Sequence, residues 1–328
     1  EDSIILNIRN STSTIIVSIS YIILGILGLS LSVLAMFLQY PSLVLYYYMV
    51  TLSKLYGNSA QTVLTIIQRA YIMICFCPLA FIVWEIARKF LSEFSSVRNI
   101  LSVRSIKMVG SFLSKSLRKY LRKYFISSLA VFLFAFSIEA ALMLTLLYPV
   151  EKDVRAFVGG LQSTCSGNTP CIVKGVVQYV DAKIRWSYNN PMSVLEIDNM
   201  LSPIDKQLLS AFRFAQAHVI LWQGWGSCGE HAVVTAYLLN RLGYTTRTAR
   251  FGDIDHEWAE VRINGSWYIV DSWYIGYIYE NQYQGNRYLV PTTVLSSLKD
   301  FSGNHRVLCS YLDNNINIET DCSKEHGY

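Results

Sequence analysis

The sequence predicts an α+β domain that follows an N-terminal transmembrane helical region of three or four spans. The chain is 52% hydrophobic and only 16% charged, and its long uncharged stretches lie before residue 150. A glycine-rich turn opens a helical pattern at residues 224–243, and a strand-like alternation surrounds the dipeptide Asn264-Gly265. We therefore expect a membrane region at residues 1–150 and a globular domain at residues 151–328.

Uncharged stretches define the expected spans. Residues 14–40 contain no charged side chain, and 27 residues in a helix are long enough to cross the hydrocarbon core. Residues 70–87 and 125–150 each contain a single acid and are the next candidates. The stretch at residues 42–56 is apolar but short, and is a fourth span, a re-entrant segment or an interfacial helix. Four spans are favoured over three.

A basic loop sets the expected orientation. Residues 88–124 contain ten basic side chains and one acid, within a chain whose net charge is +5. Basic loops beside spans stay on the cytoplasmic side, so residues 151–328 are expected to be extracytoplasmic, on a multi-pass protein of the cell membrane. The lipid bilayer is then an expected partner. Because candidate spans flank the loop on both sides, a nucleic-acid partner is not expected.

Five of the seven cysteines follow residue 150. Cys165 and Cys171 bracket a short polar loop, and Cys309 and Cys322 bracket an Asn-rich segment, so two local disulfides are the simplest pairing. Four cysteines allow three connectivities, and the sequence does not choose among them. Cys228 is then the unpaired thiol.

Cys228 lies where a helix is expected to begin. The segment at residues 224–243 has a glycine-rich start, apolar residues at helical spacing from Ala232, and Gly243 as a stop signal. A thiol at a helix N-terminus is favoured as the thiolate by the unpaired N–H groups there. Cys228 is therefore a candidate nucleophile that needs a base.

An expected β-hairpin supplies that base. Residues alternate in polarity on both sides of Asn264-Gly265, with His256 near the start of the first strand and Asp271 near the end of the second. These two ends lie side by side in an antiparallel hairpin. Asp271 is then placed to bind one imidazole nitrogen while the other faces Cys228, which predicts a catalytic triad.

Three motifs resemble those of the transglutaminase-like superfamily within the papain-like thiol enzymes. They are Gly226-Ser227-Cys228 before a helix, His256-Glu257-Trp258-Ala259-Glu260-Val261, and Trp267-Tyr268-Ile269-Val270-Asp271. The similarity covers about residues 172–273, and Ser272 stands where many members have proline. The resemblance implies a papain-like core, in which the helix that carries the cysteine packs on an antiparallel sheet.

The resemblance also implies a reaction. A thiolate would attack a carboxamide or peptide carbonyl to form an acyl-enzyme, which water or an amine resolves. The oxyanion would be held by the backbone N–H of Cys228 and by a donor just upstream, for which Gln223 and Trp222 are the candidates.

The other histidines give no competing site in the sequence. Cys228 and His231 have the spacing of a metal-ligand pair, but no matching second pair is present, so no metal or other cofactor is expected. His218, His305 and His326 have no comparable partners and are interpreted as surface or structural residues.

Two classes of function remain open. The first is a thiol enzyme acting on protein or peptide substrates at the cell surface, either as a protease or amidase or as a transglutaminase-type acyltransferase. A peptide N-glycanase-like reaction shares the triad. The second class is a non-enzymatic surface or assembly protein that binds partners through the same fold.

Overall fold

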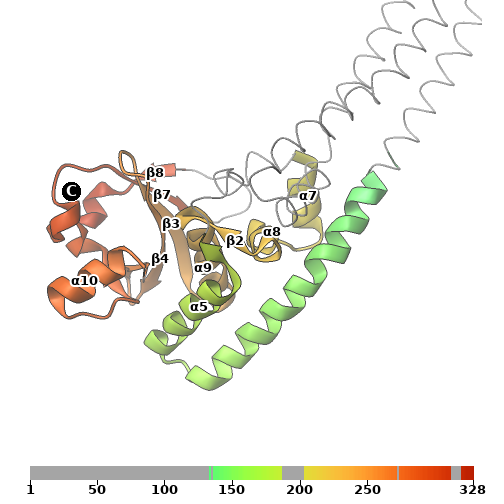
Figure 1. Ribbon diagram of the computed structural model, residues 1–328, viewed down its shortest axis with the longest axis horizontal. Helices are drawn as coiled ribbons and strands as arrows, with labels where there is room; N and C mark the ends of the chain where they lie inside the picture. The colour runs from blue at the N-terminus through green and yellow to red at the C-terminus, as the bar shows by residue number, and fades with distance from the viewer. Residues whose placement is uncertain (1–132, 134–135, 187–202, 272, 312–318) are drawn as a thin grey trace, which may run out of the picture. The chain divides into compact units, whose positions relative to one another are not determined.

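The computed structural model describes residues 133, 136–186, 203–271, 273–311 and 319–328 (Figure 1). The chain divides into two compact units, residues 1–139 and residues 140–328. The second unit is an α+β fold with a six-stranded antiparallel sheet, which agrees with the globular part of the expected fold class.

The expected membrane region requires correction. Among the described residues, no helix combines the length and the apolar character needed to cross a membrane. This finding overturns the expected transmembrane helical region and the multi-pass membrane location with an extracytoplasmic domain. The candidate spans at 14–40, 42–56 and 70–87 and the basic loop at 88–124 lie outside the described residues.

The candidate span at residues 125–150 shows why hydropathy misled the prediction. Its second half belongs to a helix through residues 136–165, which continues past the expected boundary and carries the buried acid Glu151. The helix buries one face and exposes the other, as an amphipathic helix does. The buried apolar residues are Met143, Leu147 and Val154, and the exposed ones are Ile138, Leu144 and Tyr148.

One sheet organises the fold. Its strand order is β6-β5-β4-β3-β7-β8, and every neighbouring pair is antiparallel. The strands are β3 Thr245–Phe251, β4 Glu257–Ile263, β5 Ser266–Val270, β6 Val290–Pro291, β7 Val307–Tyr311 and β8 Glu319–Asp321.

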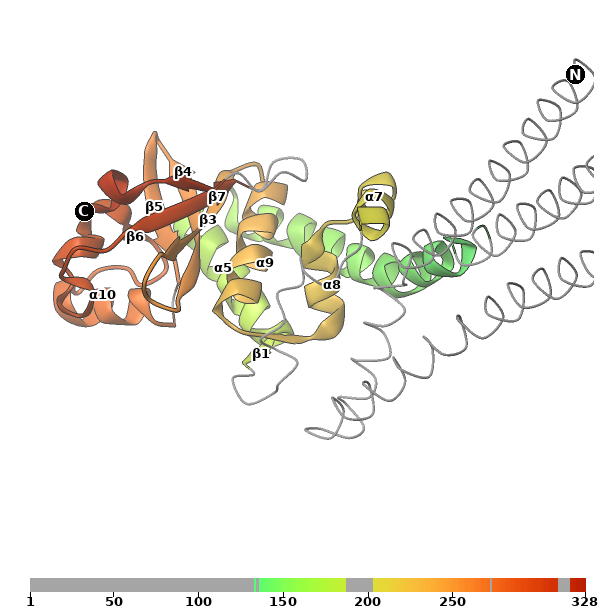
Figure 2. The ribbon, with the colours of Figure 1, turned by 90° about the horizontal axis from the view of Figure 1, so that it is seen from above.

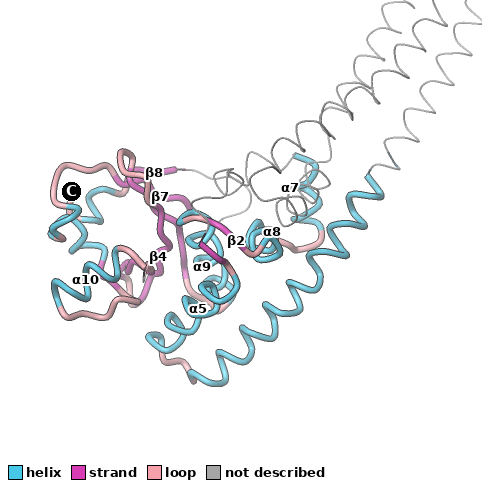
Figure 3. The backbone as a smooth tube through the Cα atoms, in the orientation of Figure 1, coloured by secondary structure: helices cyan, strands magenta, loops and turns pink. Residues whose placement is uncertain are grey.

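Helices cover both faces of this sheet (Figures 2 and 3). The longer ones are α5 Thr169–Lys183, α7 Pro203–Ala211, α8 Gln216–Gln223, α9 Cys228–Arg241 and α10 Ile275–Tyr283. The 3₁₀ turns are η2 Thr292–Ser297, η3 Lys299–Phe301 and η4 Ser323–His326, and a small parallel pair joins β1 Arg185–Trp186 to β2 Trp225–Gly226. Helix α9 packs on β3 and β4 on the face shared with α5, while α10 lies on the other side of the sheet.

The second face of the sheet carries a compact apolar core. Side chains from β3, β4, β5 and β7 pack there with residues of α10 and of the 3₁₀ turns. The largest of them are Phe251, Trp258, Ile269, Ile275 and Phe301. The β4–β5 hairpin is thus held between α9 on one side and this core on the other.

Local sequence explains the ends of α9. Ser227 is the N-cap. Its backbone N–H and its hydroxyl donate hydrogen bonds to the Glu230 carboxylate, at 2.8 Å and 2.7 Å. This is a capping box, which satisfies donors that the first turn leaves free. Gly243 follows the helix with φ of 95°, a left-handed conformation that glycine adopts without strain.

The hairpin and the disulfides agree with the sequence. Strands β4 and β5 are joined by Asn264 and Gly265, both at positive φ as a type I′ turn requires. The cysteines pair locally, in the simplest of the three connectivities, as Cys165–Cys171 and Cys309–Cys322. Cys228 is the free cysteine of the described residues.

Candidate active site

Cys228 is the first residue of α9 and is partly exposed. The two-residue pairing of β2 with β1 and the capping box of Ser227 fix the turn that precedes it. The N–H groups at this end of the helix carry partial positive charge. The fold therefore presents the predicted nucleophile in the predicted local environment.

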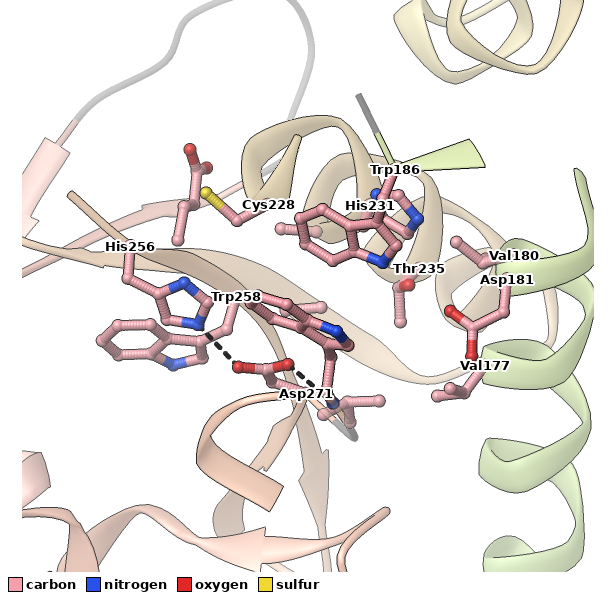
Figure 4. A pocket seen from close by; sticks show the side chains of 15 residues that line it. Val177, Val180, Asp181, Trp186, Cys228, His231, Thr235, His256, Trp258 and Asp271 are labelled. Carbon is pink, nitrogen blue, oxygen red and sulfur yellow. Dashed lines mark hydrogen bonds and ion pairs between the residues drawn. The ribbon is translucent and has the colours of Figure 1, made fainter. Parts of the chain in front are cut away.

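His256 and Asp271 lie at neighbouring ends of the hairpin. His256 directly precedes β4, and Asp271 directly follows β5. Nε2 of His256 donates to Oδ2 of Asp271 at 2.6 Å. Figure 4 shows Cys228 on the opposite side of the imidazole ring from Asp271. All three residues line one pocket, so the structure brings the predicted triad together.

Asp271 is fixed by the start of α10. Its Oδ1 accepts backbone N–H groups from Trp273 at 3.2 Å and Tyr274 at 3.3 Å, and its Oδ2 accepts from Ile275 at 3.2 Å. A carboxylate that caps a helix in this way has few other orientations available. The aspartate therefore holds the His256 ring in one position.

The electrostatics of the pair favour the charged forms of both side chains. Burial alone would lower the pKa of His256, but the hydrogen bonds to Asp271 and Cys228 outweigh it and raise the pKa to about 9. Burial likewise opposes ionisation of Asp271, but its contact with His256 and its backbone N–H donors hold its pKa below the usual value. At neutral pH His256 is therefore an imidazolium, and it lies beside the Cys228 sulfur.

A buried hydrogen-bond network surrounds Glu260 on β4. His256 just before β4, and Trp258 and Glu260 within it, occupy alternate positions and so share one face. The Trp258 indole donates to Glu260 at 2.8 Å, and Arg247 donates to the other Glu260 oxygen at 2.7 Å. His326 also contacts Glu260. Sequence reasoning did not single out Arg247 and interpreted His326 only as a surface or structural residue, because these contacts join residues far apart in the chain.

An aromatic stack forms another wall of the pocket. The Trp186 ring stacks on His231 with centroids 4.4 Å apart and on Trp273 at 4.4 Å. The pairing of Trp186 with Gly226 brings this ring next to the turn before Cys228. Sequence reasoning missed the stack, and its only local signal was the position of Trp273 two residues after Asp271.

The predicted oxyanion donors do not lie in the pocket. The side-chain amide of Gln223 donates to the backbone carbonyl of Trp225 at 2.9 Å. Neither Gln223 nor Trp222 is among the described residues that line the pocket. In this structure the amide of Gln223 is therefore engaged elsewhere.

The interpretation of the remaining histidines was wrong on one point, because three of them have carboxylate partners. The pairs are His218–Glu151 at 2.7 Å, His305–Asp253 at 2.8 Å and His326–Glu260. These partners are between 52 and 67 residues apart in sequence, which is why local pattern did not show them. Of the four histidine–carboxylate pairs, only His256–Asp271 lies in the pocket with Cys228.

One group of described residues has three metal-ligand atoms within 4.8 Å of one another: Cys309, Cys322 and His326. Both sulfur atoms belong to a disulfide, and both His326 ring nitrogens have partners, Nδ1 the carbonyl of Cys322 and Nε2 Glu260. The donor atoms of this group are therefore already engaged.

Comparisons of the chain with known protein families, with curated proteins and with solved structures found no match.

Proposed function

We propose that this chain is a thiol enzyme that acts on amide or peptide bonds of proteins or peptides through an acyl-enzyme intermediate on Cys228. One observation carries the proposal: a free cysteine at a helix N-terminus shares a pocket with a buried histidine that is hydrogen-bonded to a partly buried aspartate. Nucleophile, base and orienting acid in this arrangement are the components of covalent acyl transfer. The similarity of the three motifs to transglutaminase-like enzymes supports the same chemistry.

The proposed reaction has two steps. The Cys228 thiolate attacks the substrate carbonyl carbon, and the carbon–nitrogen bond breaks as the His256 imidazolium gives its proton to the leaving nitrogen. Neutral His256 then takes a proton from water or from an amine, which attacks the thioester carbonyl and releases Cys228 as thiolate. Asp271 stays ionised throughout and orients the ring.

The test is the reactivity of Cys228 toward iodoacetamide at neutral pH, followed by peptide mapping in a mass spectrometer. We compare the wild type with His256→Ala and with His305→Ala, because His305 forms a similar pair with Asp253 at 2.8 Å outside the pocket. The proposal predicts that His256→Ala slows labelling at least about tenfold, a typical lower limit for loss of an activating base, while His305→Ala does not. Equal rates in all three proteins, with Cys228 accessible, would exclude activation by His256.

A further inference from the structure

Within the part of the chain that the structure describes, His231 is the one histidine with no hydrogen bond to a carboxylate. Its Nδ1 donates to the carbonyl oxygen of Ser227 at 2.9 Å. With the proton on Nδ1, the neutral ring presents a lone pair at Nε2. Nε2 is buried and has no hydrogen-bond partner among the described residues, in a side chain that is only 9% exposed. Buried polar atoms are rarely left in this state, so an acceptor here points to a missing donor.

The side chains around His231 indicate which kind of donor would bind there. His231 lies one helical turn after Cys228, and Figure 4 shows it between Cys228 and the residues of α5. On α5 the apolar side chains of Val177 and Val180 line the pocket, with the carboxylate of Asp181 beside them. An apolar wall that ends in two acceptors matches an aliphatic stem that ends in a cation.

The charged side chains that line the pocket also favour a cation. Its described lining contains three carboxylates, on Asp181, Glu257 and Asp271, and neither lysine nor arginine. The His256 imidazolium offsets one of these charges. Burial and the charge of Asp271 raise the pKa of Asp181 and outweigh His231 and Arg287, which lower it; a bound cation would further favour the carboxylate.

We propose, on the basis of the function proposed above, that the α5 side of the pocket is a subsite for a primary ammonium group on the acylated substrate, as at the end of a lysine side chain. His231 Nε2 accepts one ammonium hydrogen bond, and Asp181 supplies the counter-charge. A cavity of about 30 Å³ has room for a group the size of a water molecule, such as an ammonium.

The experiment uses two peptide chloromethyl ketones that alkylate Cys228. One has a lysyl side chain next to the ketone, and the other has a neutral isostere in which a methyl group replaces the ammonium. Second-order labelling rates are measured by mass spectrometry for the wild type, Asp181→Asn, His231→Phe and His231→Gln. Asp300→Asn is the matched control, because Asp300 is exposed and lies outside the described pocket.

In the wild type we expect the lysyl probe to react at least about tenfold faster than its isostere, as for one charge-assisted contact. The preference should fall toward one in Asp181→Asn and His231→Phe, recover in part in His231→Gln, whose side-chain oxygen also accepts, and persist in Asp300→Asn. Any variant that does not fold is recognised by circular dichroism, and the other substitution then carries the test.

Three outcomes contradict the inference. Equal rates with both probes in a wild type that labels quickly, and in a His256-dependent way, overturn the subsite and leave the proposed function standing. The same follows if the preference survives in Asp181→Asn and His231→Phe. If pentylamine shields Cys228 equally from both probes while the probes show no preference, the ammonium belongs to an attacking amine and not to the acylated substrate.

Discussion

Similar histidine–carboxylate pairs lie beside the two ends of α9, but the histidine pKa is shifted in opposite directions in the two pairs. Beside its N-terminus, His256 contacts Asp271 at 2.6 Å, and beside its C-terminal half, His218 contacts Glu151 at 2.7 Å. Burial lowers the pKa of His218 and outweighs the contact with Glu151, whereas the contacts of His256 outweigh its burial and raise its pKa to about 9. A short histidine–carboxylate distance is therefore not in itself a sign of catalysis.

The neighbours explain the difference. Arg241 contacts Glu151 at 3.2 Å and opposes a second positive charge on His218. The Glu151 carboxylate is thus shared, and its pKa falls to about 2 despite burial, because His218, Arg155 and Arg241 all bind it. Beside His256 the additional neighbour is a thiol instead of a cation. The difference fits the proposed function, in which the first pair takes part in chemistry, while the second pair joins the helix of residues 136–165 to α8 and α9.

Removing the acid of the structural pair should have the largest effect on stability. In Glu151→Ala, the buried His218 ring and the part-buried Arg241 guanidinium lose their carboxylate partner, and we expect the free energy of unfolding to fall by about 3–5 kcal/mol. Urea denaturation measures this loss. Cys228 labelling in the folded variant should stay within about twofold of wild type, since additivity holds for distant sites. A large drop in labelling without loss of stability would reverse the two assignments.

Lowering the pH should likewise reduce the stability of the wild type. The folded pKa of Glu151 lies below its unfolded value, so its contribution to stability is present above about pH 4.5 and is lost as the pH falls toward 2. Denaturation midpoints between pH 6 and pH 2 measure it. The slope should be smaller in Glu151→Gln, and an unchanged slope would contradict the assigned pair.

Weakening the pair in the pocket should change reactivity more than stability. In Asp271→Asn the His256 ring loses its charged partner, and its pKa should fall by about 1–3 units from the present value near 9. Histidine ¹³C NMR titration measures the shift, with Asp253→Asn, beside His305, as the control. Because the folded pKa is raised, the stabilisation is complete below about pH 6.5 and is lost as the pH rises through 9. An unshifted pKa would show that Asp271 does not hold the proton on His256.

A glycine close to Asp271 gives a smaller steric test. A Cβ at Gly276 would overlap the backbone carbonyl oxygens of Asp271 and Arg287, and backbone cannot move aside as a flexible side chain can. Gly276→Ala should therefore cost about 1–3 kcal/mol and displace the start of α10 that caps Asp271. The melting temperature and the rate of Cys228 labelling should both fall. A variant that is as stable and as reactive as wild type would show that this packing does not position the aspartate.

The smallest expected effect is a gain. Gly159 lies within the helix of residues 136–165, and a Cβ there would meet no atom within 4 Å. Gly159→Ala should raise the free energy of unfolding by about 0.5–1 kcal/mol through helix propensity alone and leave labelling unchanged. The matched comparison measures the melting temperatures of Gly159→Ala and Gly276→Ala together. A loss of stability in Gly159→Ala would contradict the open space at this position.

Sequence reasoning succeeded where the signal was local. The start of α9 at Cys228 and its stop at Gly243, the Asn264-Gly265 turn and the local disulfides all depend on residues close in the chain. The relative placement of Cys228, His256 and Asp271 then followed from one helix start and one hairpin.

Reasoning failed where the signal was long-range. Glu151 and His218 are 67 residues apart, and neither pattern nor spacing links them. The apolar stretch before Glu151 satisfied a hydropathy criterion, yet the described helix buries one face and exposes another. Hydropathy counts side chains and does not record the direction in which they point, which only the packed structure supplies.

The central claim is that Cys228 carries an acyl group, and p-nitrophenyl acetate tests it most directly. Nitrophenol release is followed by absorbance and the Cys228 adduct by intact mass, in wild type, Cys228→Ala and His256→Ala. We expect a burst near one equivalent with an acetyl group on Cys228, followed by slower turnover that His256→Ala abolishes. Release that is unchanged in Cys228→Ala, with no adduct on Cys228 in the wild type, would contradict the claim.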